Sequence, residues 1–167
     1  WMYDESLKMP FIVKWPGVVE PGSRDKHLVQ NLDYASTFLE MAGAPVPADL
    51  QGKSLVPLLK GESPKDWRKA IYYHYYEYPS VHMVPRHYGI RTARHKLMRF
   101  YQFDEWEFYD LRKDPDELHN AYADSAQAKT VKRLKTQLEK LRKRYQDDSD
   151  VSVMPKEWQN KVRPPQG

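Results

Sequence analysis

The clearest strand pattern in the sequence is HYGIRTARHKLMRFYQFDEWEFYDL, residues 87–111. It holds three short runs rich in β-forming residues, HYGIRT, HKLMRFY and WEFYDL, with polar spacers between them. Such residues favour strands, and short spacers favour hairpins between consecutive strands. A fourth run of the same kind, AIYYHYYEY, precedes them at residues 70–78. Together the four runs predict a four-stranded antiparallel meander.

The region after the meander predicts one long amphipathic helix. Its apolar residues recur at steps of three and four: Val131, Leu134, Leu138, Leu141 and Tyr145. Asp124 or Ser125 is expected as the N-cap, and the apolar stripe should cover one face of the sheet. Residues 65–147 therefore predict a compact α+β subdomain, and residues 148–167, which contain three prolines, predict an extended tail.

Residues 1–64 predict a different organisation. The apolar run MPFIVKWPG at residues 9–17, closed by a Pro-Gly turn, predicts a buried strand. Apolar positions between Leu32 and Ala42 predict a helix with one buried face, ended by Gly43 as its C-cap. One strand cannot form a sheet, so this part predicts the remainder of a larger α/β domain. Because the strand edges would be unpaired, the chain alone is expected to aggregate or self-associate.

Composition narrows the class of protein. With 40% hydrophobic and 30% charged residues, the 167-residue chain is globular in character. The absence of cysteine excludes disulfides, thiolate metal sites and a cysteine nucleophile within it. No apolar run approaches the ~18 residues needed to span a bilayer. The start, WMYDESLKMP, has neither an initiator Met nor the features of a signal peptide, as expected of a fragment or processed chain.

The net charge of +4 is concentrated near the C-terminus, where residues 125–167 carry 11 basic and 5 acidic side chains. These basic residues surround the apolar stripe of the predicted helix, which is the usual arrangement of a solvated helix face. No recognised nucleic-acid motif accompanies them. The charge pattern therefore does not favour a general surface for polyanions, and nucleic acid is not an expected partner.

Five phrases, in this order, resemble the C-terminal third of type I sulfatases of the alkaline phosphatase-like superfamily. They are WMYDESLKMPFIVKWPG, NLDYASTFLEMAG, QGKSLVPLLKG, YGIRTARHKLMRFY and FYDLRKDPDELHN. The ordered set is most similar to bacterial carbohydrate sulfatases, including N-acetylglucosamine-6-sulfatase-like enzymes. The resemblance implies a large α/β domain that carries the active site, followed by a subdomain with a four-stranded antiparallel sheet and a long helix.

The resemblance also implies a chemistry. A Cys or Ser in a C/S-x-P-x-R motif becomes formylglycine, whose hydrate attacks the sulfate sulfur beside a calcium ion. This chain has no Cys, no S-x-P-x-R and no Asp-Asn-Gly or Asp-His-Gly motif. Neither a catalytic residue nor a metal ligand is therefore expected within it. Lys8 follows the MYDES phrase, so it is not the sulfate-contacting lysine that the resemblance implies before that phrase. The chain alone is expected not to hydrolyse sulfate esters, and calcium and formylglycine are expected in the parent.

His87 and Arg86 are the candidate substrate-binding residues. They lie in the loop VPRHYG, at the entry to a predicted strand, and the resemblance implies that this loop faces the cleft and touches the sugar. A neutral imidazole offers sugar hydroxyls one donor and one acceptor. The alternatives are a structural or solvent-facing role for His87 and a surface position for Arg86.

The tyrosine-rich run at residues 72–78 should present its side chains alternately to two faces of the sheet. One face carries Ile71, Tyr73 and Tyr75, and the other Tyr72, His74 and Tyr76. One set is expected under the helix and the other against the main domain or the cleft. Packing is the commoner use of such rings, although they can also stack on sugars. No helical H-x-x-x-H spacing or carboxylate cluster accompanies the histidines, so they do not predict a metal site.

These observations favour a C-terminal fragment of a secreted or periplasmic bacterial sulfatase that acts on sulfated carbohydrate. The fragment would supply structure and one wall of the substrate cleft. Its expected partners are the missing N-terminal catalytic portion and the sulfated carbohydrate. Two alternatives stay open, a stand-alone glycan-binding or interaction module and a basic nucleic-acid-binding domain.

Overall fold

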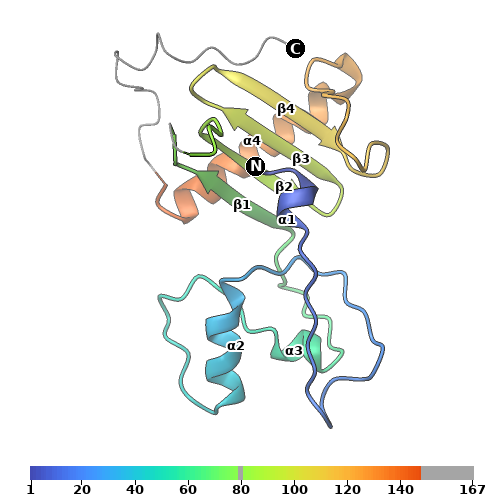
Figure 1. The fold of residues 1–167 in the computed structure, drawn as a ribbon, viewed down its shortest axis with the longest axis vertical. Helices are drawn as coiled ribbons and strands as arrows, with labels where there is room; N and C mark the ends of the chain where they lie inside the picture. Colours follow the sequence, from blue (N-terminus) through green and yellow to red (C-terminus); the bar gives the residue numbers. More distant parts are fainter. Residues whose placement is uncertain (79–80, 148–167) are drawn as a thin grey trace. The chain divides into compact units, whose positions relative to one another are not determined.

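The predicted meander forms a four-stranded antiparallel sheet with strand order β1-β2-β3-β4, seen at the top of Figure 1. The strands are β1 Ala70–Tyr75, β2 His87–Thr92, β3 His95–Phe100 and β4 Glu105–Asp110. The computed structural model describes residues 1–78 and 81–147. It divides the chain into two compact units, which are described separately. The first contains Trp1–Met9 and the residues from Ala70 onward, and the second is Pro10–Lys69.

The long helix α4, Ala128–Arg144, lies across one face of the sheet, as predicted (Figure 1). Its residues Val131, Leu134 and Leu138 are buried in one core with sheet residues that include Tyr88, Ile90, Leu97 and Phe108. A short 3-10 turn, η1 Ser125–Gln127, opens the helix. The carboxylate of Asp124 accepts the amide of Ala126 at 2.8 Å and so caps η1. The N-cap of α4 itself is Gln127, without a side-chain cap hydrogen bond, so neither Asp124 nor Ser125 is the N-cap of the long helix.

The opposite face of the sheet is covered by the N-terminal segment, which includes α1, Asp4–Leu7. Met2 is fully buried there with Met98, Phe100 and Tyr109. It fits because Gly89 has no side chain. A Cβ on Gly89 would lie 2.5 Å from the sulfur of Met2 and 2.5 Å from the carbonyl oxygen of Leu97.

The first nine residues therefore belong to the unit that contains the sheet. The sequence pattern instead assigns them to the predicted α/β part, residues 1–64. The predicted domains 1–64 and 65–147 stay a prediction about the parent protein, and the predicted tail 148–167 lies outside the described residues.

The second unit contains α2, Asp33–Met41, and α3, Val56–Leu59. Gly43 ends α2 in the left-handed conformation, with φ of 66°. The amides of Gly43 and Ala44 donate to the carbonyls of Glu40 and Leu39, which is the Schellman pattern. The prediction of a helix with this C-cap is confirmed.

The prediction that α2 buries an apolar face is wrong for this chain. The buried residues are Asp33, Ser36 and Thr37, whereas Phe38 is 65% exposed. The polar face can be buried because other residues of the same unit supply its hydrogen-bond and ion-pair partners. Asp33 forms an ion pair with Arg68 and accepts the amide of Lys53 at 2.9 Å. Ser36 donates to the carbonyl of Gly52 at 2.9 Å.

The predicted buried strand at residues 9–17 is also wrong here. The segment forms no strand, and Met9 and Ile12 are 75% and 90% exposed. Residues 10–69 contain no other strand with which it could pair, and a lone strand leaves its backbone groups without partners. The predicted turn does form, because the amide of Val18 donates to the carbonyl of Trp15 at 3.1 Å and Gly17 has φ of 78°. Across the described residues, no helix has the length and apolar character of a membrane span.

Candidate functional site

His87 lies at the start of β2 on the sheet face that the N-terminal segment covers, and it is fully buried. Four aromatic rings surround its imidazole. The centroid distances are 6.0 Å to Trp1, 5.7 Å to Tyr73, 5.6 Å to Tyr75 and 5.1 Å to Phe100. We call these five residues the His87 cage. The register of β1 and β2 sets Tyr75 directly opposite His87, and strand alternation turns Tyr73 to the same face.

The hydrogen bonding of His87 fixes which ring nitrogen carries the proton. Nδ1 lies 2.7 Å from the carbonyl oxygen of Pro85, and a carbonyl only accepts, so Nδ1 is the donor. Nε2 is then an acceptor, and it is buried without a hydrogen-bond partner in the described structure. Burial lowers the pKa of His87 to about 4, so the ring is neutral at pH 7. A buried acceptor without a partner costs about 1–3 kcal/mol.

Arg86 does not join the cage. Its Nη2 donates to the carbonyl oxygen of Tyr78 at 2.7 Å, and its amide donates to Oε1 of Gln102 at 2.7 Å. The positive charge of Arg86 contributes a lowering effect to the pKa values of His74 and Tyr101, which lie on the α4 side of the sheet. Of the two predicted residues, His87 therefore lies in the cage. Arg86 lies outside it, and its hydrogen bonds stabilise the loop before β2.

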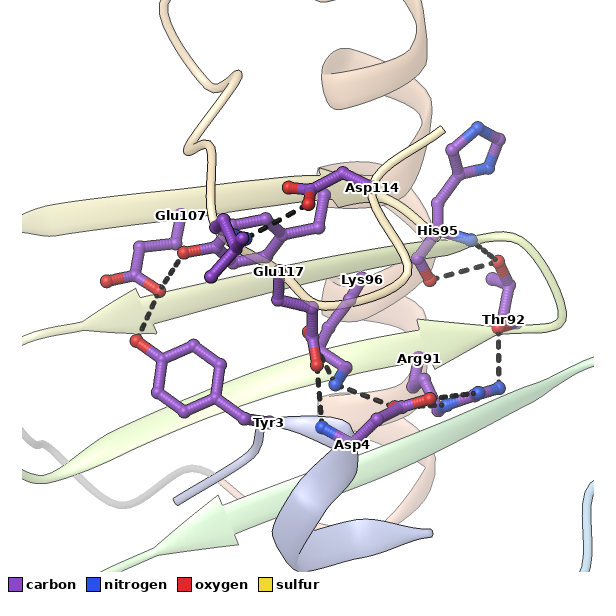
Figure 2. A network of polar contacts seen from close by, with 11 residues as sticks. Tyr3, Asp4, Arg91, Thr92, His95, Lys96, Glu107, Asp114 and Glu117 are labelled. Carbon is purple, nitrogen blue, oxygen red and sulfur yellow. Dashed lines mark hydrogen bonds and ion pairs between the residues drawn. The ribbon is translucent and has the colours of Figure 1, made fainter. Parts of the chain in front are cut away.

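A buried charge network holds the N-terminal segment against the sheet (Figure 2). The Asp4 carboxylate accepts from Arg91 Nη2 at 2.9 Å and from Lys96 Nζ at 2.8 Å. Lys96 is fully buried and also lies 2.6 Å from Oε1 of Glu117, an ion pair without hydrogen-bond geometry. Oε2 of Glu117 accepts the amide of Asp4 at 2.6 Å. We call these four residues the Asp4 anchor.

The electrostatics of the anchor favour the ionised carboxylate of Asp4. Burial alone would raise the pKa of Asp4, but hydrogen bonds from Arg91 and Lys96 outweigh burial and hold the pKa at about 2. Glu117 reaches its place with a left-handed backbone, φ of 55°, which is uncommon outside glycine. Next to the anchor, Oε2 of Glu107 accepts from the hydroxyl of Tyr3 at 2.9 Å.

No pattern in the sequence predicts the anchor. Its members are separated by up to 113 positions, and no local pattern joins them. One signal is present in the sequence, because a lysine stands directly before the buried pair Leu97 and Met98 in β3. A charged residue inside such a strand requires a partner of opposite charge.

A second polar cluster lies on the α4 side of the sheet. Nδ1 of His74 lies 2.6 Å from Oδ2 of Asp147, and its Nε2 lies 3.2 Å from the hydroxyl of Tyr101. Tyr72 donates to the same carboxylate, and the ring of Tyr76 stacks on His74 at 3.7 Å. The predicted alternation of the tyrosine-rich run is confirmed. This cluster ties β1 to the residues that follow α4, which is a structural role.

The second unit contains a Ser–His–Asp contact series. Nδ1 of His27 lies 3.0 Å from Asp25, and Nε2 lies 3.3 Å from the hydroxyl of Ser63. Asp25 also accepts the amide of His27 at 2.7 Å, which is the geometry of a local Asx turn in an exposed loop. The turn accounts for the contact without a catalytic role.

The described residues offer no cluster of three or more His, Asp or Glu side chains that could hold a metal ion. The calcium ion that the family resemblance implies stays an expectation about the parent protein. Around His87 the described residues place a neutral hydrogen-bond acceptor among aromatic rings.

Comparison with known proteins defines the class. A family model described as "N-sulphoglucosamine sulphohydrolase, C-terminal" matches residues 1–144, and the chain belongs to this family. The chain is 48% identical, over 151 residues, to an N-acetylglucosamine-6-O-sulfatase of Bacteroides thetaiotaomicron. The match covers 89% of this chain and 27% of that relative. A Delta 4,5-hexuronate-2-O-sulfatase of the same organism is 32% identical, over 87% of this chain and 31% of the relative.

Solved structures agree with the predicted fold class. One, determined in complex with its substrate D-glucosamine-2-N,6-O-disulfate, matches with a TM-score of 0.80 and 48% identity. It covers 83% of this chain, which in turn covers 28% of that protein. A 2-O GAG sulfatase matches with a TM-score of 0.71 and 29% identity, over 80% and 29% of the two chains. The chain therefore spans less than a third of the length of these relatives.

Proposed function

We propose that this chain is the C-terminal part of a sulfatase that removes sulfate from a sulfated carbohydrate, and that it forms one wall of the substrate cleft. The observation that carries the proposal is the 48% identity with an N-acetylglucosamine-6-O-sulfatase over 89% of the chain. The similarity to a structure solved with a sulfated glucosamine supports the same class of substrate. A 6-sulfated N-acetylglucosamine is accordingly the substrate to test.

The nucleophile and the metal ion belong, in this proposal, to the N-terminal portion of the parent protein. Formylglycine requires a Cys or Ser in the activating motif, and this chain contains neither Cys nor S-x-P-x-R. When bound in the parent, calcium would polarise the sulfate group. Secreted and periplasmic bacterial locations fit an enzyme that acts on polymeric sulfated sugars, and we propose one of them for the parent.

The exposed apolar residues of the second unit support a large intramolecular partner. Phe11 and Tyr34 stack on each other at 5.2 Å, and Phe38 and Ile12 are 65% and 90% exposed. Apolar surface of this kind marks an interface. The N-terminal portion would cover it, whereas the alternative of a stand-alone glycan-binding module would leave it in water.

Within this wall we propose His87 as the residue that contacts the sugar. Its support is chemical, because Nε2 is a neutral acceptor without a partner and lies among aromatic rings. A sugar hydroxyl would donate to it once a neighbouring ring moves aside. Arg86 is the weaker candidate, because its guanidinium already donates to the carbonyl of Tyr78.

The test is sulfate release by the full-length enzyme from N-acetylglucosamine 6-sulfate. His87→Ala should lower kcat/KM about tenfold, the equivalent of one lost hydrogen bond. His95→Ala is the matched control, because His95 stacks on Phe108 on the α4 side of the sheet, away from the cage. An unchanged kcat/KM for His87→Ala would remove His87 from the substrate site.

A further inference from the structure

We infer that three cations beside α4 form a second binding site, which takes the anionic groups of a sulfated oligosaccharide. The cations are Arg99 of β3 and Lys135 and Arg142 of α4, and we call them the cation row. The row lies on the α4 side of the sheet, the face opposite the His87 cage. The inference rests on the proposed function, which supplies the sulfated carbohydrate.

Pairing within the sheet places the first member of the row. Arg99 lies directly opposite Tyr88 of β2 on one side and Trp106 of β4 on the other. Directly paired residues point to the same face of a sheet, and Tyr88 and Trp106 both pack in the core beneath α4. The guanidinium of Arg99 accordingly lies over the ring of Trp106, 5.4 Å from its centroid, and the side chain of Arg99 is 35% exposed.

Helix geometry adds the other two cations. Lys135 and Arg142 are seven residues apart in α4, so they lie on the same side of the helix, about 10 Å apart along its axis. Nζ of Lys135 lies 4.0 Å from the ring centroid of Trp106, and the guanidinium of Arg142 lies 4.4 Å from that of Tyr88. Because Arg99 contacts both of these rings, it lies between the two helix residues.

Within the described part of the chain, the main partners of these cations are neutral. Nη1 of Arg99 and Nη1 of Arg142 donate to the same hydroxyl oxygen, that of Tyr88, at 3.2 and 3.4 Å. Lys135 donates to the hydroxyl of Tyr122 at 2.6 Å. Nε of each arginine is buried without a hydrogen-bond partner. Two positive groups thus share one neutral acceptor and keep donor capacity unused.

The carboxylates that face the row balance its charge only in part. Asp104 accepts from Nη2 of Arg99 at 2.8 Å, but its side chain is 78% exposed. Glu139 lies 3.6 Å from Arg142, beyond hydrogen-bond distance, and is 53% exposed. The charge of Asp147 also acts on Arg142, but its carboxylate already bonds to side chains of β1. Exposed ion pairs such as the first two contribute little, so an incoming anion can compete with them.

The chemistry of the row fits a ligand that carries more than one sulfate group. Guanidinium groups bind oxyanions through paired N–H donors, and an anion between like charges relieves their repulsion. One sulfate group would bridge Arg99 and Arg142, and Lys135, about 10 Å further along the helix, would meet an anionic group on a neighbouring sugar. The surrounding field is positive, because α4 carries eight basic side chains and one acidic. The sulfated substrates of the relatives favour a glycan over nucleic acid.

Calorimetric titration of the full-length protein with a heparin-derived hexasaccharide tests the inference. Replacing Arg99 and Arg142 together with glutamine should raise the Kd at least tenfold, because two charged donors to sulfate are lost. The matched control replaces Lys132 and Lys140, exposed residues of the same helix, with glutamine. It removes the same charge and should raise the Kd less than about threefold. For N-acetylglucosamine 6-sulfate, a single sugar, both variants should keep kcat/KM within about twofold of the wild type.

The outcomes separate the inference from the proposed function. A wild-type enzyme that releases no sulfate contradicts the proposed function. Equal Kd values for the wild type and the variant with Arg99 and Arg142 replaced, or equal losses in the two double variants, overturn the inference alone. Single-stranded DNA of similar charge that binds as tightly as the hexasaccharide, and loses as much in that variant, also overturns the assignment to a sulfated glycan.

A measurement on the wild type covers the case of a variant that folds poorly. Saturating hexasaccharide should reduce the acetylation of Lys135 by acetic anhydride, as read by mass spectrometry of peptides. Acetylation of Lys132, which is exposed on the same helix, should change little and is the internal control. Unchanged acetylation of Lys135 in the presence of the hexasaccharide overturns the inference.

Discussion

At the scale of single residues, His87 shows how a polar group can be buried with its proton held on one ring nitrogen and the other nitrogen left without a partner in the described part of the chain. The carbonyl of Pro85 holds the proton on Nδ1, and the surrounding rings exclude water from Nε2. The same burial that lowers the pKa keeps the imidazole uncharged. A charged imidazolium would donate from both nitrogens, whereas the neutral ring can also accept a hydrogen bond at one of them.

Replacing His87 with glutamine should reduce the loss of stability in acid. The unfolded imidazole binds a proton below about pH 6.5, whereas the folded one binds it only below about pH 4. Between these values the unfolded state holds more protons, so the free energy of unfolding falls as the pH drops through this window. The full effect is on the order of 3 kcal/mol.

The measurement is urea unfolding of the wild type and the variant at about pH 7 and about pH 4.5. His74 and His95, whose pKa values burial also lowers, are present in both proteins and cancel in the comparison. Equal losses of stability in the two proteins would show that His87 titrates normally in the folded state.

At the scale of elements, the Asp4 anchor joins four parts of the chain that are distant in sequence. Asp4 opens α1, Arg91 belongs to β2, Lys96 to β3, and Glu117 to the loop after β4 (Figure 2). Lys96 and the carboxyl group of Glu117 are at most 1% exposed. Desolvation makes such charges costly, so the anchor specifies one arrangement of these elements more than it adds net stability.

Replacing Lys96 with methionine should therefore destabilise the sheet-containing unit strongly, by about 3–5 kcal/mol, because two buried carboxylates lose their shared cation. Chemical denaturation measures the loss. Hydrogen exchange should show increased opening of residues 1–9 in particular. Lys53→Met is the matched control, since Lys53 pairs at 2.8 Å with Asp66, whose side chain is 82% exposed. Comparable losses for the two variants would exclude a special role for the anchor.

At the scale of the whole molecule, the two units differ in how completely they are covered. The sheet has α4 on one face and the N-terminal segment on the other. In contrast, α2 turns its polar residues inward and leaves Phe38 and Met41 65% and 40% exposed. This arrangement is unfavourable in water, and a proposed parent protein whose remaining part covers the helix would account for it.

Replacing Phe38 with serine should make the 167-residue chain less prone to self-association but should make the full-length protein less stable. In the 167-residue chain the substitution should reduce self-association, measured by sedimentation velocity, because it removes exposed apolar surface. In the full-length enzyme it should lower the free energy of unfolding by about 1.5–3 kcal/mol, because Phe38 would be buried there. The matched control is Val81→Ser, which replaces another exposed apolar residue in the sheet-containing unit. Unchanged association and unchanged stability would contradict an interface on α2.

The meander and the long helix could be predicted because their signals are local. Alternation in 70–78 and the steps from Val131 to Leu141 encode which side faces a core. The run at 9–17 and the apolar face of α2 carry equally clear local signals, yet both are exposed in this chain. A local pattern indicates that an apolar surface needs to be covered. It does not indicate whether the covering residues belong to the same chain.

Residue order alone was enough to predict the sheet, its covering helix and the family, since these depend on local patterns and on contacts between neighbouring elements. Only the tertiary structure decided that the first nine residues cover the second face of the sheet, that Lys96 joins Asp4 to Glu117, and that Trp1 lies on His87. The physical reason is separation along the chain. Packing and ion pairing depend on distance in space, and no pattern within a few residues records which distant side chains meet.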